Sequence, residues 1–483
     1  MTHGNNAKSL PQILAALAAA GGALVAGTVL GWSSQIETEL VTNDKYGFDI
    51  SEEQFSWFSS ITNLGAGFMC IPTGYLCGLI GRKFTLLGLA IPLILGWSLV
   101  TFANENGMIL AGRFFLGMGS GGFCVAAPMY TGEIASKNIR GTLGSFFQLM
   151  ITLGILVAYI LGAYCSLFVY NIICFVLPFI FIITFAFMPE SPRYLEAETK
   201  AALQRLRGDS YDITAELNEL KSEDEKSKNE NVNAFAALGK KVGIKSLFIG
   251  LGLMFFQQLS GINAVIFYSG SIFKDANTGM SMTICTIIVG IVQVVATFVS
   301  TLIVDKAGRK LLLIVSAVSM AICTICLGVY FYMQKQDEES VKDIAWLPLA
   351  SLILFICMFS IGFGPVPWLM MGELFSHEIK SIASSLCGTT NWMLAFIVTK
   401  AYGPLKDGIG GGPVFWIFSG ISLIGGVFVF LATPETKGKT LAEVQAHLEG
   451  SSANKSNPQK LKRTTIFVKY LKSVYFFYFK LFV

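Results

Sequence analysis

The sequence predicts an all-α membrane protein with twelve transmembrane helices in two six-helix halves. Of its 483 residues 53% are hydrophobic and 14% are charged, and the mean hydropathy is +0.61, which is too apolar for a soluble protein of this length. A helix needs about 20 apolar residues to cross a bilayer. Apolar runs of this length are centred near residues 22, 66, 94, 118, 151, 177, 258, 291, 322, 358, 390 and 422.

Short motifs occur once in each half of the chain, in the same order. Gly-Arg-Lys follows the second and eighth runs, a Glu seven residues before a basic residue follows the fourth and tenth, and Pro-Glu follows the sixth and twelfth. The pairs are Gly81-Arg82-Lys83 with Gly308-Arg309-Lys310, Glu133 and Arg140 with Glu373 and Lys380, and Pro189-Glu190 with Pro434-Glu435. Duplication of a six-helix unit in one orientation explains this order, and it places a substrate path between the halves.

These features divide the chain into four parts. Residues 1–188 form the N-terminal six-helix half, 189–245 a hydrophilic cytoplasmic linker with short helices, 246–434 the C-terminal half and 435–483 a cytoplasmic tail. Basic residues gather in alternate loops, on the same side as the linker, so the positive-inside rule predicts that both termini are cytoplasmic. The tail is aromatic and basic, and its lysines interrupt it too often for a further span, so we expect it at the membrane interface.

Three carboxamides stand out inside the seventh apolar run, at Gln257, Gln258 and Asn263. In hydrocarbon each would leave donors and acceptors unpaired, at several kcal/mol per lost bond as an order of magnitude. On an unbroken helix Asn263 would point about 140° away from Gln258, but Gly261 permits a bend that brings them together. Such groups suit a ligand covered in hydroxyls; the alternative is that they join helices within the bundle.

Several function classes find no support in the sequence. It has no P-loop, no G-x-S-x-G and no H-E-x-x-H motif, which disfavours an ATP-driven pump or a membrane enzyme. The cysteines are scattered through the spans and none of the three histidines lies in one, so a disulfide framework and a histidine metal site are not expected. No basic patch suggests nucleic acid. We expect no cofactor and no obligate protein partner, only a small neutral substrate and the lipid bilayer.

At this point the motifs resemble a known family, the sugar porters of the major facilitator superfamily, and within it the glucose-transporter-like insect facilitated trehalose transporters. The resemblance covers about residues 10–448. Besides the repeated motifs it rests on Arg140-Gly141-Thr142, Gln148-x3-Thr152-x-Gly154-Ile155-Leu156, Pro189-Glu190-Ser191-Pro192-Arg193, Gln257-Gln258-x2-Gly261-x-Asn263, Gly364-Pro365-x-Pro367-Trp368, Asn391-Trp392 and Pro434-Glu435-Thr436-Lys437-Gly438. The resemblance implies a major facilitator fold and sugar transport by alternating access.

The resemblance also implies a sugar site. Carboxamides would hydrogen-bond ring hydroxyls and indole faces would cover the apolar face of a pyranose, although both tryptophans have bundle packing as an alternative role. One position departs from the family, because Gln293 stands where Asn is usual. The implied residues are Gln148, Gln257, Gln258, Asn263, Gln293, Trp368, Asn391 and Trp392.

A cytoplasmic gate is implied as well, with ion pairs that lock the inner side while the outer side is open. Exposed pairs at a rim are worth only about 0–1 kcal/mol each, which suits switching. The implied residues are Arg82, Glu133, Arg140, Glu190, Asp305, Arg309, Glu373, Lys380 and Glu435. Gly78 stands where the first-half motif usually has an acidic residue, and Lys380-Ser381 replaces Arg-Gly, so we expect a looser inner gate.

Two further positions predict whether transport is coupled to protons and which sugar is carried. Proton-linked relatives carry a carboxylate in the first span, whereas nothing acidic occurs here between Pro11 and Ile36. Glucose-type carriers often have an acidic residue eight positions before the tenth-span tryptophan, where this chain has Ser360. We therefore predict passive uniport of a neutral sugar, trehalose first, across the plasma membrane. The alternatives are a hexose (glucose) uniporter, a proton-coupled symporter and a sugar sensor.

Overall fold

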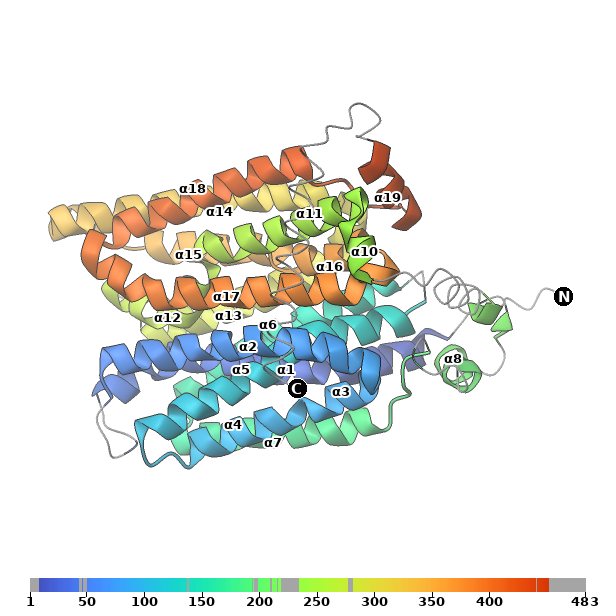
Figure 1. The fold of residues 1–483 in the computed structure, drawn as a ribbon. Helices are drawn as coiled ribbons and strands as arrows, with labels where there is room; N and C mark the ends of the chain where they lie inside the picture. The colour runs from blue at the N-terminus through green and yellow to red at the C-terminus, as the bar shows by residue number, and fades with distance from the viewer. Residues whose placement is uncertain are drawn as a thin grey trace.

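The computed structural model describes residues 8–42, 46, 50–136, 139–192, 194, 199–208, 211–214, 216–218, 234–276, 281–439 and 441–450. Within these residues the regular structure is entirely helical (Figure 1). The predicted Ser222–Glu230 segment and the tail beyond Gly450 lie outside the described residues.

The first half of the chain contributes seven helices, because the third predicted span divides at Leu89 into two. They are α1 (Ser9–Thr42), α2 (Glu52–Leu79), α3 (Arg82–Gly88), α4 (Ala90–Thr101), α5 (Asn106–Ile134), α6 (Arg140–Tyr164) and α7 (Leu167–Ala186). Short helices of the linker follow, among them α8 (Thr199–Arg207) and α10 (Ala234–Gly239).

The second half also contributes six spans. In this half the first and fourth spans are broken. Its helices are α11 (Lys241–Gln257), η1 (Gln258–Ile262), α12 (Asn263–Asp275), α13 (Met282–Ala307), α14 (Arg309–Gln336), η2 (Glu338–Ile344), α15 (Leu347–Ile361), α16 (Pro365–Leu374), α17 (His377–Ile409), α18 (Gly411–Ala432) and α19 (Leu441–Gly450).

Eleven stretches of the described chain are long and apolar enough to cross a membrane. The remaining predicted span is α2, a helix of 28 residues that buries Ser59, Ser60, Thr62 and Asn63. These polar groups lower its hydropathy, and they do not face lipid, because α2 packs against α5 and α17 inside the bundle. The structure therefore agrees with twelve spans, of which α2 is the most polar.

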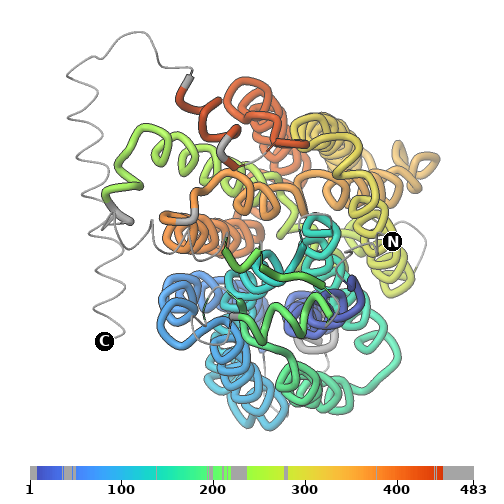
Figure 2. Tube along the Cα trace, turned by 90° about the vertical axis from the view of Figure 1, so that its right-hand side faces the viewer, coloured from blue at the N-terminus to red at the C-terminus, as the bar shows by residue number. Residues whose placement is uncertain are grey.

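The two halves lie against each other as two layers of helices. Figure 2 shows the first half, blue to green, on one side and the second half, yellow-green to red, on the other. The halves meet where α2 packs against α17, α6 against α13, and α1 against α12. The outward faces of the bundle expose apolar side chains such as Ile183, Phe430 and Leu431, as expected for a surface in contact with lipid.

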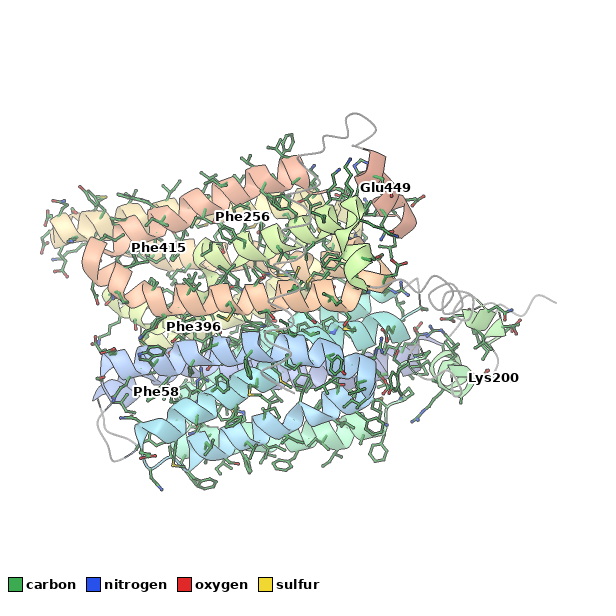
Figure 3. The ribbon with its side chains drawn as sticks, in the orientation of Figure 1. Phe58, Lys200, Phe256, Phe396, Phe415 and Glu449 are labelled. Carbon is green, nitrogen blue, oxygen red and sulfur yellow. The ribbon has the colours of Figure 1, made fainter. Side chains whose placement is uncertain are left out.

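The short helices α8, α10 and α19 all lie at one end of the bundle (Figure 1). We call this the linker end and the opposite end the far end. Figure 3 places Lys200 and Glu449 at the linker end and Phe256, Phe396 and Phe415 along the length of the bundle. Charged side chains thus gather beyond the apolar belt, where water is available to them.

Candidate functional site

The seventh span is broken at Gly261. This residue has φ +91° inside the π-helical turn η1, and a Cβ here would lie 2.5 Å from the ring of Phe418. A side chain is therefore excluded both by the left-handed backbone and by space. The break separates α11 from α12, so Gln258 and Asn263 do not follow one helical phase. The bend that the sequence predicts at Gly261 is present.

The break brings four carboxamides together, from α11, η1, α12 and α17. Gln258 Nε2 donates to Asn391 Oδ1 (2.5 Å), Asn391 Nδ2 donates to Gln257 Oε1 (2.6 Å), and Asn263 Nδ2 donates to Gln258 Oε1. All four side chains are buried. We call Gln257, Gln258, Asn263 and Asn391 the carboxamide network.

A second helix break completes the surroundings of this network. The tenth span stops at Ile361 and restarts at Pro365, which leaves backbone carbonyls without a partner in the helix. Gln257 Nε2 donates to the carbonyls of Phe363 (2.5 Å) and Gly364 (2.9 Å). Just before this break Ser360 is buried, and its hydroxyl has no hydrogen-bond partner. The network therefore joins the breaks of spans seven and ten to span eleven.

The remaining predicted site residues lie on the helices at the interface between the halves. Gln148 on α6 and Trp368 on α16 are half-buried, and Gln293 on α13 is buried. These three helices pack on one another, but in the described part of the chain no hydrogen bond joins the three residues to the network. Trp392 follows Asn391 on α17, is buried, and has an indole N–H without a partner.

The carboxamide network is neutral and satisfies most of its own hydrogen-bonding capacity. A hydroxyl both donates and accepts, so it replaces a carboxamide partner without leaving an uncompensated charge. Two polar groups close in sequence to the second helix break and to Asn391 have no hydrogen-bond partner. They are the hydroxyl of Ser360, which can donate and accept, and the indole N–H of Trp392, which can donate. The arrangement fits a polyhydroxylated, uncharged ligand.

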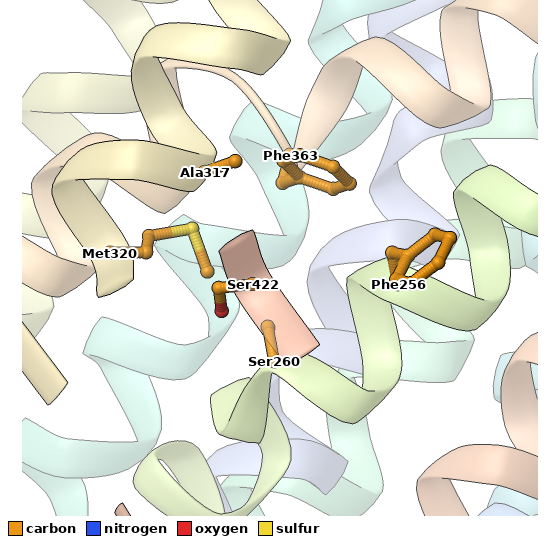
Figure 4. Close-up of a pocket in the computed structure, with 6 residues that line it drawn as sticks. All are labelled: Phe256, Ser260, Ala317, Met320, Phe363 and Ser422. Atoms are coloured by element: carbon orange, nitrogen blue, oxygen red, sulfur yellow. The ribbon is translucent and has the colours of Figure 1, made fainter. Parts of the chain in front are cut away.

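A narrow gap with no room for a water molecule lies inside the second half (Figure 4). Its two hydroxyls are already used, because Ser260 donates to the carbonyl of Gln257 (2.7 Å) and Ser422 to that of Phe418 (2.8 Å). The rest of the lining is Phe256, Ala317, Met320 and Phe363. This apolar space accommodates the break in span seven and offers nothing to a sugar.

Charged side chains cluster at the linker end of the first half. Arg82 Nη2 lies 2.9 Å from Glu133 Oε1, and Arg82 Nη1 donates to the carbonyl of Cys77 (3.0 Å). Ser191 donates to the other oxygen of Glu133. Glu190 accepts the backbone N–H of Arg82 (3.1 Å). Arg82, Glu133 and Glu190 form what we call the first charged cluster.

The second half carries a matching cluster. Arg309 Nη2 lies 2.9 Å from Glu373 Oε1 and 2.8 Å from Asp305 Oδ1, and Arg309 Nε donates to Glu373 (3.2 Å). Thr436 donates to Glu373, and Glu435 accepts the backbone N–H of Arg309 (3.0 Å). Asp305, Arg309, Glu373 and Glu435 form the second charged cluster. Arg82 with Glu133 in the first half, and Arg309 with Glu373 in the second, thus form ion pairs, and their role as a gate stays a prediction.

A glycine with positive φ precedes the arginine in each cluster. Gly81 has φ +89° and Gly308 has φ +90°. A Cβ would lie 2.5 Å from Glu190 Oε2 at the first position and 2.8 Å from Glu435 Oε2 at the second. Only glycine lets the carboxylate reach the N–H groups at the start of α3 and α14, where the helix dipole favours an anion.

Glu435 shows the electrostatic result of this geometry. Burial alone would raise its pKa, but hydrogen bonds from the backbone N–H groups of Lys437, Arg309 and Lys310 hold the pKa of Glu435 below its ordinary value. Donors aimed at a carboxylate favour its charged form. Glu435 is therefore ionised at neutral pH.

Arg140 lies at the start of α6, and Lys380 lies near the start of α17. These are the helices that follow Glu133 and Glu373 along the chain. Asp305 lies against the residue after Arg140, since a Cβ on Gly141 would be 2.8 Å from Asp305 Oδ2. This contact crosses from the second half to the first, at a helix N-terminus that attracts a carboxylate.

A family comparison decides the identity of this architecture. The family model described as "Sugar (and other) transporter" matches residues 14–448. The chain belongs to this sugar transporter family. It is a multi-pass membrane transporter and not an enzyme, as the sequence predicts.

Curated relatives in this family include proteins named facilitated trehalose transporter Tret1. The chain is 39% identical to the one from Polypedilum vanderplanki over 457 residues, which is 93% of this chain and 90% of the relative. It is 37% identical to that of Culex quinquefasciatus, covering 88% of it. The relative from Drosophila pseudoobscura pseudoobscura is 38% identical over 93% of this chain, which spans only 52% of its length.

Solved structures confirm the major facilitator fold. The proton:xylose symporter XylE bound to 6-bromo-6-deoxy-D-glucose has a TM-score of 0.76 at 24% identity, over 92% of this chain and 100% of that one. The inward-open conformation of XylE from E. coli has a TM-score of 0.70 at 24% identity, over 90% of this chain and 98% of that one.

Some contributors to this sugar transporter's charged clusters were missed by sequence reasoning. Ser191 and Thr436 donate to Glu133 and Glu373 in equivalent positions. Each hydroxyl residue directly follows the Pro-Glu pair of its half, at Glu190 and Glu435. This shared Glu-Ser or Glu-Thr spacing was the signal available in the sequence.

Arg113 on α5 is the other notable charge of the first half. It is fully buried, and it donates to the carbonyls of Phe58 (3.1 Å) and Val29 (2.8 Å). Its guanidinium lies 4.8 Å from the ring centre of Trp32. Two carbonyls and an aromatic face thus stabilise this cation in place of a carboxylate.

Proposed function

We propose that this transporter carries trehalose across the plasma membrane by facilitated, uncoupled diffusion, with the two halves rocking about a central site. The observation that carries the proposal is the neutral carboxamide network, which links spans seven, ten and eleven at the helix breaks. The name of the curated relatives supports trehalose as the substrate.

The sugar would contact the network together with the aromatic and amide residues on the neighbouring helices. Carboxamides would exchange their mutual hydrogen bonds for sugar hydroxyls, and indole faces would pack on the ring. The proposed site consists of Gln148, Gln257, Gln258, Asn263, Gln293, Trp368, Asn391 and Trp392. Closing the site around the sugar costs little free energy, because each carboxamide exchanges a hydrogen bond to another carboxamide for a hydrogen bond to a sugar hydroxyl.

Among the described residues no carboxylate pairs with Arg113, which supports uniport. A proton-coupled cycle needs a group in the path that gains and loses a proton. The first span has no acidic residue between Pro11 and Ile36, and Arg113 donates to backbone carbonyls instead. The proton gradient then has no group on this span through which to act.

We also propose that the linker end is cytoplasmic, which places both termini inside the cell. The charged clusters lie at this end and would form the inner gate, with Arg82, Glu133, Glu190 and Arg140 in the first half and Asp305, Arg309, Glu373, Lys380 and Glu435 in the second. Basic residues on this side support the orientation.

Uptake of labelled trehalose and labelled glucose into oocytes tests the substrate and the site. We expect saturable trehalose uptake that is lost in Gln258→Ala, because this change removes the residue that joins Asn263 to Asn391. Ser98→Ala is the matched control, since Ser98 donates only to Ile94 within its own helix α4.

Three results would contradict the proposal in different ways. Glucose uptake without trehalose uptake would make the chain a hexose uniporter. Unchanged uptake in Gln258→Ala would exclude the network as the site. Failure to move either sugar, with the protein present at the surface, would favour a sugar sensor.

A further inference from the structure

Toward the far end neutral side chains of the two halves form hydrogen bonds with the opposite half, beside a bond from Lys400 Nζ on α17 to Ser56 Oγ on α2 (3.4 Å). The hydroxyls of Ser34 on α1 and Ser269 on α12 are 2.5 Å apart, and Asn63 Nδ2 on α2 donates to Thr399 Oγ1 on α17 (3.1 Å). Tyr159 on α6 donates to the carbonyl of Ile266 on α12 (3.2 Å). We call these side chains the outer seam: Ser34, Asn63, Tyr159, Ser269 and Thr399.

The outer seam lies beyond the carboxamide network on two helices that carry both. On α12, Ser269 follows Asn263 by six residues, across a kink at Tyr268 (φ −121°, ψ 19°). On α17, Thr399 follows Asn391 by eight residues, or about 12 Å. Both helices run away from the linker end (Figure 1). The separation is comparable with the length of a disaccharide, whereas a single pyranose would not span it.

Every member of the outer seam is buried and uncharged. Asn63 Oδ1 has no hydrogen-bond partner although Asn63 is fully buried. When the halves part on this side, the hydroxyls and the amide lose their partners and must bind water or ligand hydroxyls. The ion pairs of the charged clusters at the linker end, in contrast, each lie within one half.

We propose that the outer seam, once parted, binds the second ring of a disaccharide whose first ring lies on the carboxamide network. This inference rests on the proposed transport of trehalose. The hydroxyls and the carboxamide of the outer seam suit a pyranose for the same reason as the carboxamide network does, because they both donate and accept hydrogen bonds without charge. The seam thereby favours a two-ring substrate over a monosaccharide, which reaches the network alone.

The double variant Asn63→Leu/Thr399→Val tests this proposal with little change in volume. It removes both partners of one bond across the halves, so no polar group is left unpaired in the closed state. Binding of trehalose and of glucose to the purified full-length protein is followed by tryptophan fluorescence. We expect the Kd for trehalose to rise about fivefold to tenfold, the loss expected for one or two neutral hydrogen bonds, and the Kd for glucose to stay within about twofold.

Ser34→Ala/Ser269→Ala repeats the test at the second pair of the outer seam. Gln258→Ala should weaken both sugars, and Ser98→Ala neither. In proteoliposomes the KM for trehalose influx from the far side should rise in both double variants while the KM for efflux is unchanged, because only the outward-open state exposes the seam.

Equal changes in affinity for trehalose and glucose, or equal changes in the two KM values, would show that the seam only closes the far side and would overturn the proposal. Unchanged trehalose affinity in both double variants would also overturn it. If the unmodified protein binds neither sugar, the proposed function itself fails, and the outer-seam proposal fails with it.

Discussion

The two charged clusters have the same plan but not the same number of contacts. Arg309 contacts Glu373 through Nε and Nη2 and contacts Asp305 through Nη2. Arg82 contacts Glu133 through Nη2 alone, and its buried Nε has no partner. The second cluster therefore holds its arginine more firmly, and the two charged clusters differ in strength.

The cause of the difference lies four residues before each arginine. Asp305 occupies this position in the second half and Gly78 in the first. Asp305 also lies against Gly141 of the opposite half, where any side chain would collide with it. The equivalent contact between the halves joins α17 to α2. There the hydroxyl of Ser381 donates to the carbonyl of Gly74 (3.1 Å).

The largest expected effect comes from removing each arginine in turn. Arg309→Met leaves Asp305 and Glu373 as two unneutralised carboxylates, at a cost of about 2–3 kcal/mol. Arg82→Met leaves one unneutralised carboxylate, Glu133, and costs less, about 1–2 kcal/mol. The unfolding temperature of the purified protein and the transport rate should both be lower in Arg309→Met than in Arg82→Met. Equal losses in the two variants would contradict the difference between the clusters.

The next effect comes from giving the first cluster its missing carboxylate. A Cβ at Gly78 meets no atom within 4 Å, so Gly78→Asp is sterically free and places an acid four residues before Arg82. A rim pair contributes about 0–1 kcal/mol, so we expect inward opening to slow by up to about fivefold. Asp305→Asn should have the opposite effect.

Gly78→Asn is the matched control for the position 78 change, because it adds the same side chain without charge. The rate of inward opening is followed by stopped-flow tryptophan fluorescence in proteoliposomes. If Gly78→Asp and Gly78→Asn open at the same rate, the missing carboxylate does not explain the weaker cluster.

A smaller effect is expected at the hydrogen bond across α2 and α17. Ser381→Ala removes only the hydroxyl that donates to Gly74, and the carbonyl of Gly74 keeps its helical partner. The loss should be about 0.5 kcal/mol or less, which changes the transport rate less than about twofold. A larger loss, measured at equal surface expression, would assign this seam a greater share of the gate.

The smallest effect is expected from pH on the linker side. The pKa of Glu435 lies below its ordinary value, so its stabilisation is complete above that ordinary value and is lost only as pH falls through the lowered pKa. Transport should be unchanged between about pH 5.5 and about pH 7.5, well above the usual range for glutamate. A marked change in this range would show that another group titrates during the cycle.

The sequence predicted the fold for definite physical reasons. Apolar runs of span length and the repeated motifs are local features, so they were visible without coordinates. The bend at Gly261 followed from the need to pair Gln258 and Asn263 away from lipid. The boundaries of the four parts of the chain and the roles of the sugar-site residues stay predictions.

Contacts between distant segments were not visible in the sequence. Gln257 donates to the carbonyls exposed by the break before Pro365, and such backbone acceptors have no residue signature. Gly78 and Ser381 were two separate departures from the family pattern in the sequence. The structure shows that they belong to the same seam, because Ser381 contacts α2 one turn before Gly78.

Trehalose accumulation in proteoliposomes, with and without an imposed inward proton gradient, tests the central claim most directly. An uncoupled carrier with a neutral site moves the sugar only down its own gradient. We predict that internal trehalose reaches the external concentration and stops there in both conditions, and that Gln258→Ala abolishes the flux. Accumulation above the external concentration when the proton gradient is imposed would contradict uniport and would make the chain a proton-coupled symporter.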